Sequence, residues 1–158
     1  MVAVLYVCLG NICRSPAAES FLKHLARKHE ILDKFTIDSC GLGDWHKGQL
    51  PDERMREAGK SRGLVMAGRA KMFKYENFDQ FDYIFAADKE VLNELYKYAT
   101  TAEEKGKIHL ITAFSRTHKG EDVPDPYYYQ DAAFDLVLDI LEDSCEGFIE
   151  HLQHEHAI

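Results

Sequence analysis

The segment that decides the fold is residues 2–16, which reads VAVLYVCLGNICRSP. Its first part, Val2 to Val7, is a continuous apolar run rich in β-prone residues, as expected of a strand covered on both faces. The Gly-Asn pair that follows indicates a turn, and Ser15-Pro16 is typical of a helix start with Ser15 as the cap. The segment therefore predicts a strand ending at Cys8, a loop and a helix.

The alternation of strands and helices continues along the chain. Further strands are expected at residues 35–40, 81–87 and 108–111, and further helices at residues 51–62, 89–98 and about 132–153. Because parallel neighbours need crossover connections, this order predicts an α/β fold of flavodoxin-like type: a three-layer, four-stranded parallel sheet with helices on both faces. The 158 residues contain no repeat and no long linker, so one domain over 1–158 is expected.

Composition limits the partners and the compartment. The formal net charge is -8, whereas nucleic acids and anionic membranes attract basic patches, so neither is an expected partner. The chain has no apolar run of about 18 residues and no basic start of a secretory signal, which favours a cytoplasmic location. The hydrophobic share of 46% is enough for a core, so the four cysteines are expected to be free thiols.

The loop from Cys8 to Ser15 carries the predicted chemistry. It lies beyond the carboxyl end of a strand, where backbone N–H groups and a helix start can hold an anion of phosphate size. The same field favours the thiolate form of Cys8, a strong nucleophile. Arg14 can hold two phosphate oxygens with its planar fork, and Ser15 can donate to the sulfur. Gly10 and Asn11 are residue types that tolerate left-handed turn geometry.

A second loop is expected to supply an acid. A thiolate displaces an alkoxide or phenoxide from phosphorus only if the leaving oxygen is protonated. Asp125 lies between Pro124 and Pro126, which stiffen its backbone. An Asp between prolines is by itself an ordinary turn residue, so the assignment depends on the Cys8 loop. Asp125 is then the acid of the first step and the base for water in the second.

These two motifs closely resemble the low-molecular-weight protein tyrosine phosphatases. The likeness is carried by residues 5–19 and by Asp125-Pro126-Tyr127-Tyr128, and it extends over nearly the whole chain. It implies a phosphocysteine intermediate at Cys8, Asp125 as general acid, and no metal or other cofactor. It also implies that Arg14 binds the oxyanion together with the loop residues Leu9, Gly10, Asn11, Ile12, Cys13 and Ser15.

The resemblance implies the substrates as well. Expected partners are phosphotyrosine-containing proteins and small aryl phosphates, with phosphate or other oxyanions as inhibitors, and the protein is expected to be a monomer or a weak dimer. Trp45 matches an aromatic wall of the family's cleft and would enclose a phenyl ring together with Tyr127. Tyr128 is expected beside them. Such a deep slot favours phosphotyrosine over the shorter phosphoserine.

Two residues match supporting positions of the family, and one departs from it. Ser39 matches a serine that braces Asn11, and Cys13 matches a cysteine that forms a reversible disulfide with Cys8. Relatives often carry His where Gly68 stands, so the way in which this loop is braced is expected to differ.

Three alternatives share part of the pattern. Thioredoxin-coupled arsenate reductases need two further cysteines near the third strand, where this chain has Ala86 and Ala87. Protein-arginine phosphatases carry Thr where Ile12 stands, so Ile12 favours an aryl phosphate. A non-catalytic phosphotyrosine-binding module needs neither Cys8 nor Asp125, and the presence of both favours catalysis.

Overall fold

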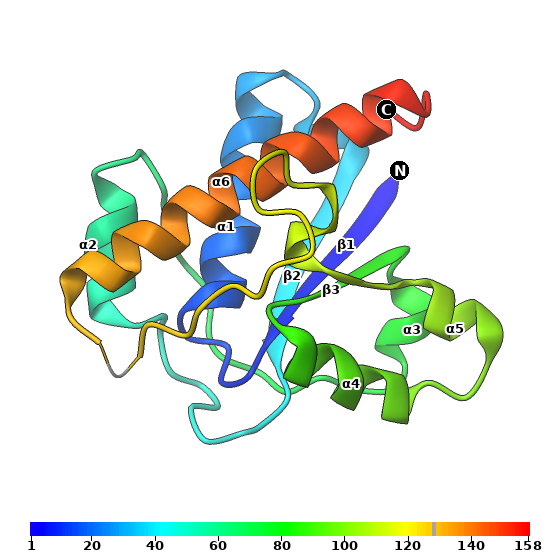
Figure 1. Cartoon of the computed structure of the whole chain (residues 1–158), viewed down its shortest axis with the longest axis horizontal. Coiled ribbons are helices and arrows are strands. Elements are labelled where there is room, and N and C mark those ends of the chain that lie inside the picture. The colour runs from blue at the N-terminus through cyan, green and yellow to red at the C-terminus, as the bar shows by residue number, and fades with distance from the viewer. Residues whose placement is uncertain (128) are drawn as a thin grey trace.

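A parallel sheet forms the centre of the molecule (Figure 1). The structure, a computed structural model, describes residues 1–127 and 129–158. Within these residues the sheet has four strands in the order β2-β1-β3-β4, and every neighbouring pair is parallel. The strands are β1 (Val2–Cys8), β2 (Phe35–Gly41), β3 (Tyr83–Ala86) and β4 (Ile108–Leu110). The predicted fold class and the four predicted strands are confirmed.

The four predicted helices are also present, with bounds that differ by a few residues. The described part of the chain contains α1 (Arg14–Lys28), α2 (Glu53–Lys60), α3 (Asn77–Gln80), α4 (Lys89–Tyr98), α5 (Ala102–Gly106), α6 (Asp131–His154) and the 3-10 turns η1 (Leu32–Lys34) and η2 (Ile111–Phe114). The sequence reasoning missed α3 and α5, because neither is long enough to show an apolar period. No described helix combines the length and apolar character needed to cross a bilayer.

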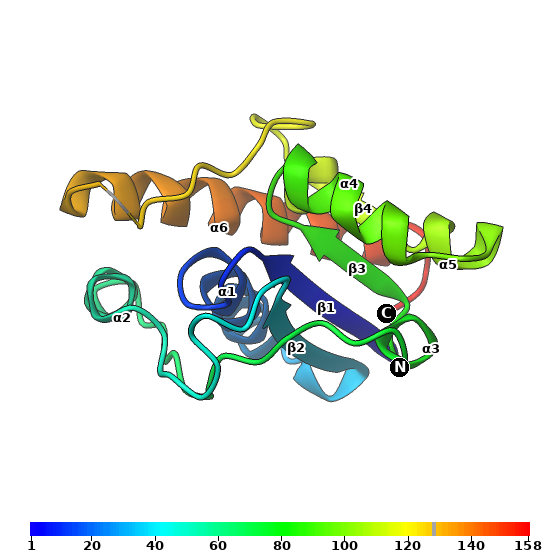
Figure 2. The same ribbon diagram turned by 90° about the horizontal axis from the view of Figure 1, so that it is seen from below.

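The sheet separates two apolar cores. On one face Val4 and Tyr6 of β1 are buried in a cluster with residues of α1 and α6. On the other face Leu5 and Val7 are buried with residues of α3 and α4. Figure 2 shows these helices on the two sides of the strands. Because successive side chains of a strand point to opposite faces, burial on both sides explains the continuous apolar run of β1.

The predicted cap of the first helix is wrong. Helix α1 begins at Arg14, its N-cap is Cys13, and no side chain caps it. Ser15 is therefore already inside the helix, where side chains point back toward the amino end. Its hydroxyl oxygen lies 2.9 Å from the sulfur of Cys8. The serine that looked like a cap faces the loop instead.

The stability of the α6 layer depends on a glycine. A Cβ at Gly147 would lie 1.8 Å from the carbonyl oxygen of Phe114 in η2. We expect Gly147→Ala to lower the free energy of unfolding by about 1–3 kcal/mol, because the helix must move away from η2. Urea denaturation measures the change.

Gly106→Ala in α5 is the matched control. A Cβ there meets nothing within 4 Å, so this variant should gain up to about 1 kcal/mol from the better helix propensity of alanine. A Gly147→Ala protein as stable as the unsubstituted one would contradict the close contact.

Candidate active site

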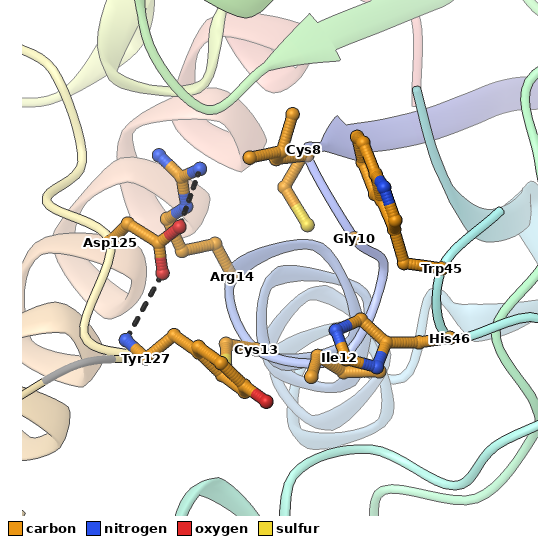
Figure 3. Close-up of a pocket in the computed structure, with 10 residues that line it drawn as sticks. Cys8, Gly10, Ile12, Cys13, Arg14, Trp45, His46, Asp125 and Tyr127 are labelled. Carbon is orange, nitrogen blue, oxygen red and sulfur yellow. Dashed lines mark hydrogen bonds and ion pairs between the residues drawn. The ribbon is translucent and has the colours of Figure 1, made fainter. Parts of the chain in front are cut away.

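A cleft opens at the carboxyl end of β1, where the loop between β1 and α1 begins. Its volume is about 360 Å³, and it is lined by Cys8, Leu9, Gly10, Ile12, Cys13, Arg14, Trp45, His46, Asp125 and Tyr127. Figure 3 shows the sulfur of Cys8 directed into the space between Arg14 and Asp125 on one side and Trp45 on the other. The sequence-predicted nucleophile, arginine and acid thus lie around one cavity.

The sulfur of Cys8 is surrounded by hydrogen-bond donors. The backbone N–H of Asn11 donates to it at 3.3 Å, and the Ser15 hydroxyl lies at 2.9 Å, as the sequence led us to expect. Hydrogen bonds from neutral donors stabilise an anion more than a neutral thiol. A sulfur at this position can therefore accept hydrogen bonds from the loop.

Asn11 fixes the shape of the loop. It has a φ of 58°, in the left-handed region that asparagine tolerates. Its side-chain amide donates to the hydroxyl oxygens of Ser15 at 2.8 Å and Ser39 at 3.1 Å, and its carbonyl oxygen accepts from the backbone N–H of Lys71 at 3.0 Å. Ser39 in turn donates to Glu19 at 2.6 Å. Ser39 thus lies where the resemblance implied.

Two glycines near the loop allow other groups to pack closely against their backbone. Gly10 tolerates left-handed geometry but does not adopt it, since it is not among the described residues with a positive φ. A Cβ on Gly10 would instead lie 2.9 Å from the His46 ring. At the end of β2, a Cβ on Gly41 would lie 2.9 Å from the backbone nitrogen of Asn11. Both positions need glycine because another backbone or ring occupies the space.

Arg14 is held by partners from two other segments. Its side chain is 3% exposed, and its Nη1 donates to Asp88 Oδ2 at 2.6 Å and to the Val123 carbonyl at 2.8 Å. Burial alone would lower the pKa of Arg14, but the negative Cys8 and the carboxylates of Asp88 and Asp125 outweigh it and raise the pKa. The guanidinium therefore stays charged, and it lines the cleft.

Sequence reasoning missed Asp88. This residue follows β3 and is the N-cap of α4, where its Oδ1 accepts from the Val91 N–H at 2.8 Å. An Asp in front of a helix is an ordinary cap. The sequence signal that could have identified Asp88 was its position directly after β3. Since β3 is a parallel neighbour of β1, the residues that follow the two strands lie close together.

The expected acid lies at the rim of the cleft. The Asp125 side chain is 37% exposed, and its Oδ2 is 3.6 Å from Arg14 Nη2. Its Oδ1 accepts from the Tyr127 N–H at 3.1 Å. Figure 3 shows this carboxylate between the two partners, facing the cavity. The position allows proton exchange with a group bound above Cys8.

Arg54, which sequence reasoning also missed, holds the loop that carries Asp125. Its guanidinium donates to the carbonyls of Tyr127 at 2.8 Å and Tyr129 at 3.1 Å, and it lies 4.6 Å from the centre of the Phe134 ring. It also donates twice to Asp52, whose own backbone N–H donates to the Ile12 carbonyl at 2.7 Å. Arg54 thus connects the loop of Asp125 to the loop that follows Cys8.

Aromatic rings form the walls of the cleft. Trp45 is 66% exposed, and Tyr127 lines the cleft with it, as the resemblance implied. His46 adds a ring that sequence reasoning missed, 5.6 Å from the ring centre of Tyr127. Tyr128, also expected at the cleft, lies outside the described residues.

The other three cysteines differ from Cys8 in their surroundings. All four are free and buried. Burial raises the pKa of Cys13 and Cys40, and the negative charges of Asp52 beside Cys13 and of Cys8 near both raise it further. Burial also raises the pKa of Cys145 to about 12. These three thiols are therefore neutral at pH 7.

Comparison with known proteins agrees with this geometry. Residues 3–157 match the family model described as low molecular weight phosphotyrosine protein phosphatase. The chain belongs to this family. Its members are phosphatases, so the chain is a hydrolase.

Individual relatives cover the whole chain. A low molecular weight protein-tyrosine-phosphatase of Bacillus subtilis is 36% identical, with 100% of both chains covered. A protein tyrosine phosphatase of Entamoeba histolytica, solved with Hepes in its active site, matches with a TM-score of 0.94 and 42% identity over 99% of both chains. A Drosophila arginine phosphatase matches with a TM-score of 0.87 and 37% identity over 94% of this chain and 96% of its own.

We expect iodoacetamide to alkylate one thiol first at pH 7. The label should be on Cys8, because the other three thiols are neutral at this pH and, of these three, Cys40 and Cys145 do not line the cleft. Peptide mass mapping after short exposure identifies the labelled residue. Inorganic phosphate should slow the labelling, and Cys8→Ser should remove it; fast labelling of Cys145 would contradict the assignment.

We expect Arg54→Met to impair the acid loop. Without the two hydrogen bonds to Tyr127 and Tyr129, Asp125 is less well placed, and displacing a catalytic group by about 1 Å can cost about 100-fold in rate. The kcat for phenyl phosphate should fall by about ten-fold or more, while inhibition by phosphate changes little. Arg116→Met, which removes a surface ion pair with Glu150, is the charge-matched control. If the affinity for inhibitory phosphate fell by the same factor as kcat, the substitution would have disrupted the whole site and not only the loop of Asp125.

Proposed function

We propose that the chain hydrolyses phosphotyrosine and small aryl phosphates through a phosphocysteine intermediate on Cys8. The observation that carries this proposal is the convergence of the Cys8 sulfur, the Arg14 guanidinium and the Asp125 carboxylate on one cavity with aromatic walls. Phosphotyrosine-containing proteins are then the substrates. The Hepes molecule named in the active site of the Entamoeba relative supports a site for oxyanions, which should act as inhibitors here.

The first step transfers the phosphoryl group to sulfur. The Cys8 thiolate attacks phosphorus, the S–P bond forms, and the bond to the phenolic oxygen breaks. Asp125 gives its proton to that oxygen, so that tyrosine leaves neutral. Arg14 Nε and Nη2 hold two equatorial oxygens, because Nη1 is already bound to Asp88 and Val123. The loop N–H groups hold the remaining charge.

The second step releases phosphate. Water attacks phosphorus from the side that the phenol has left, and the Asp125 carboxylate takes its proton. The S–P bond breaks, inorganic phosphate forms, and Cys8 is again a thiolate. The same carboxyl group is thus the acid and then the base, which its position at the rim of the cleft allows.

The aromatic walls favour an aryl group over a short alkyl group. Trp45 and Tyr127 can contact a phenyl ring on its faces, and His46 closes part of the mouth. A phosphoserine has no ring to fill this space, so the aromatic side chains of the cleft would stay exposed to water. Phosphotyrosine is therefore the preferred phosphoamino acid.

One second candidate is favoured by a specific observation. The Drosophila protein named as an arginine phosphatase is 37% identical to this chain. The side chain of Ile12 lines the cleft of this chain, where threonine was expected of an arginine phosphatase. Hydrolysis of phosphoarginine faster than phosphotyrosine by the purified protein would favour this second candidate.

Substitution of the nucleophile and the acid tests the mechanism. Cys8→Ser should abolish turnover of every substrate while leaving the fold intact. Asp125→Asn should slow phenyl phosphate by about 100-fold or more, the usual contribution of general acid catalysis. It should slow p-nitrophenyl phosphate much less, because p-nitrophenolate needs little protonation. Steady-state kinetics with both esters measures the difference, and an equal loss for both would refute the acid role.

A further inference from the structure

A second cavity opens from the catalytic cleft along α4. It has a volume of about 360 Å³ and shares Leu9, Arg14, Trp45 and Asp125 with the cleft. Its remaining lining residues are Leu42, Asp88, Glu90, Val91, Glu94 and Tyr98. We refer to this cavity as the α4 groove. Figure 2 shows why the two are continuous: β3 leads into α4 beside the carboxyl end of β1, from which the catalytic loop starts.

The α4 groove combines apolar and acidic side chains. Leu9, which is 41% exposed, and Leu42 contribute aliphatic surface, and the exposed rings of Trp45 and Tyr98 add aromatic surface. Glu90 and Glu94 are four residues apart on α4, so they lie on the same face of the helix. A ligand that lies in this groove therefore meets apolar surface and two neighbouring carboxylates.

The negative charge of the α4 groove is not neutralised by the protein. Its one lining cation, Arg14, is already paired with Asp88 and lies near Asp125. Within the described part of the chain, Glu90 has no hydrogen bond or ion pair. Glu94 pairs with Lys97 at 3.0 Å, but the Lys97 side chain is 73% exposed, and such surface pairs contribute little. A cationic ligand is therefore the complementary one.

We propose that the α4 groove binds a lysine or arginine side chain that flanks the phosphotyrosine of a peptide substrate. This inference rests on the proposed phosphotyrosine phosphatase function. Continuity with the cleft identifies the occupant, because a peptide whose phosphotyrosine is in the cleft must leave it along its rim. Lysine and arginine have an aliphatic stem that can contact Leu9 and Leu42 and a cationic head that can pair with Glu90 and Glu94.

Matched phosphotyrosine peptides test the proposal. Each pair carries lysine or glutamine at one of the three positions before or after the phosphotyrosine and is otherwise identical. We expect lysine to raise kcat/KM by about five-fold at one or more positions, since two carboxylates act on it in a partly enclosed groove. The preference should shrink as salt is raised.

Two double variants locate the effect. Glu90→Gln/Glu94→Gln should remove the lysine preference, whereas Glu76→Gln/Glu103→Gln, which removes the same charge from exposed positions elsewhere, should keep it. Asp88 is left unchanged because it holds Arg14. Phenyl phosphate serves as the internal standard, because it is too small to reach α4.

The outcomes separate the two proposals. Lysine preference lost in the groove variant and kept in the control supports the α4 groove as a subsite. Wild type without lysine preference, or a preference that survives in the groove variant, overturns it while phenyl phosphate hydrolysis leaves the proposed function standing. Failure of the wild type to hydrolyse phenyl phosphate would overturn both.

Discussion

The buried ion pair between Arg14 and Asp88 is the interaction on which the active site depends. A guanidinium removed from water is costly unless a carboxylate compensates it. Asp88 provides that compensation at 2.6 Å, across 74 positions of sequence. The same guanidinium also donates to the carbonyl of Val123, which lies on a third segment of the chain. One charge thus connects the start of α1, the start of α4 and the loop before α6, and the guanidinium still lines the cleft.

The parts of this structure that could be predicted are those encoded by neighbouring residues. The apolar run of β1, the turn after it and the periodicity of α6 each lie within one segment, so the fold class and the strands followed from the sequence. Cys8, Arg14 and Asp125 could be selected because their motifs are local and resemble a family. Arg54 and Asp88 could not, since each acts only through residues about 70 positions away. His46 was overlooked because a histidine in a polar loop has no pattern of its own.

The wrong cap at Ser15 and the unforeseen role of Gly10 have the same origin. A serine before a proline and a glycine in a turn are read by their most frequent local roles. In this chain Ser15 contacts a sulfur seven residues back, and Gly10 makes room for a ring from another loop. The brace of Asn11 also departs from the expected pattern: the backbone N–H of Lys71 and the hydroxyl of Ser39 hold its side chain, while Gly68 offers no side chain at all. The Lys71 N–H donates to this side chain and the Ser39 oxygen accepts from it, and neither group titrates near neutral pH, so these two contacts are insensitive to acidity in that range.

The contact between Gly41 and the catalytic loop has a wider consequence. The backbone of Gly41 lies directly against the backbone of the loop, so the neighbouring strand β2 limits the path that the loop can take. The curvature of the loop therefore depends on the order of the strands in the sheet. Loop side chains that do not brace it as Asn11 does can then be exchanged to alter selectivity without changing its path. The selectivity of the site and the path of the loop can in this way change separately, provided that position 41 carries no side chain.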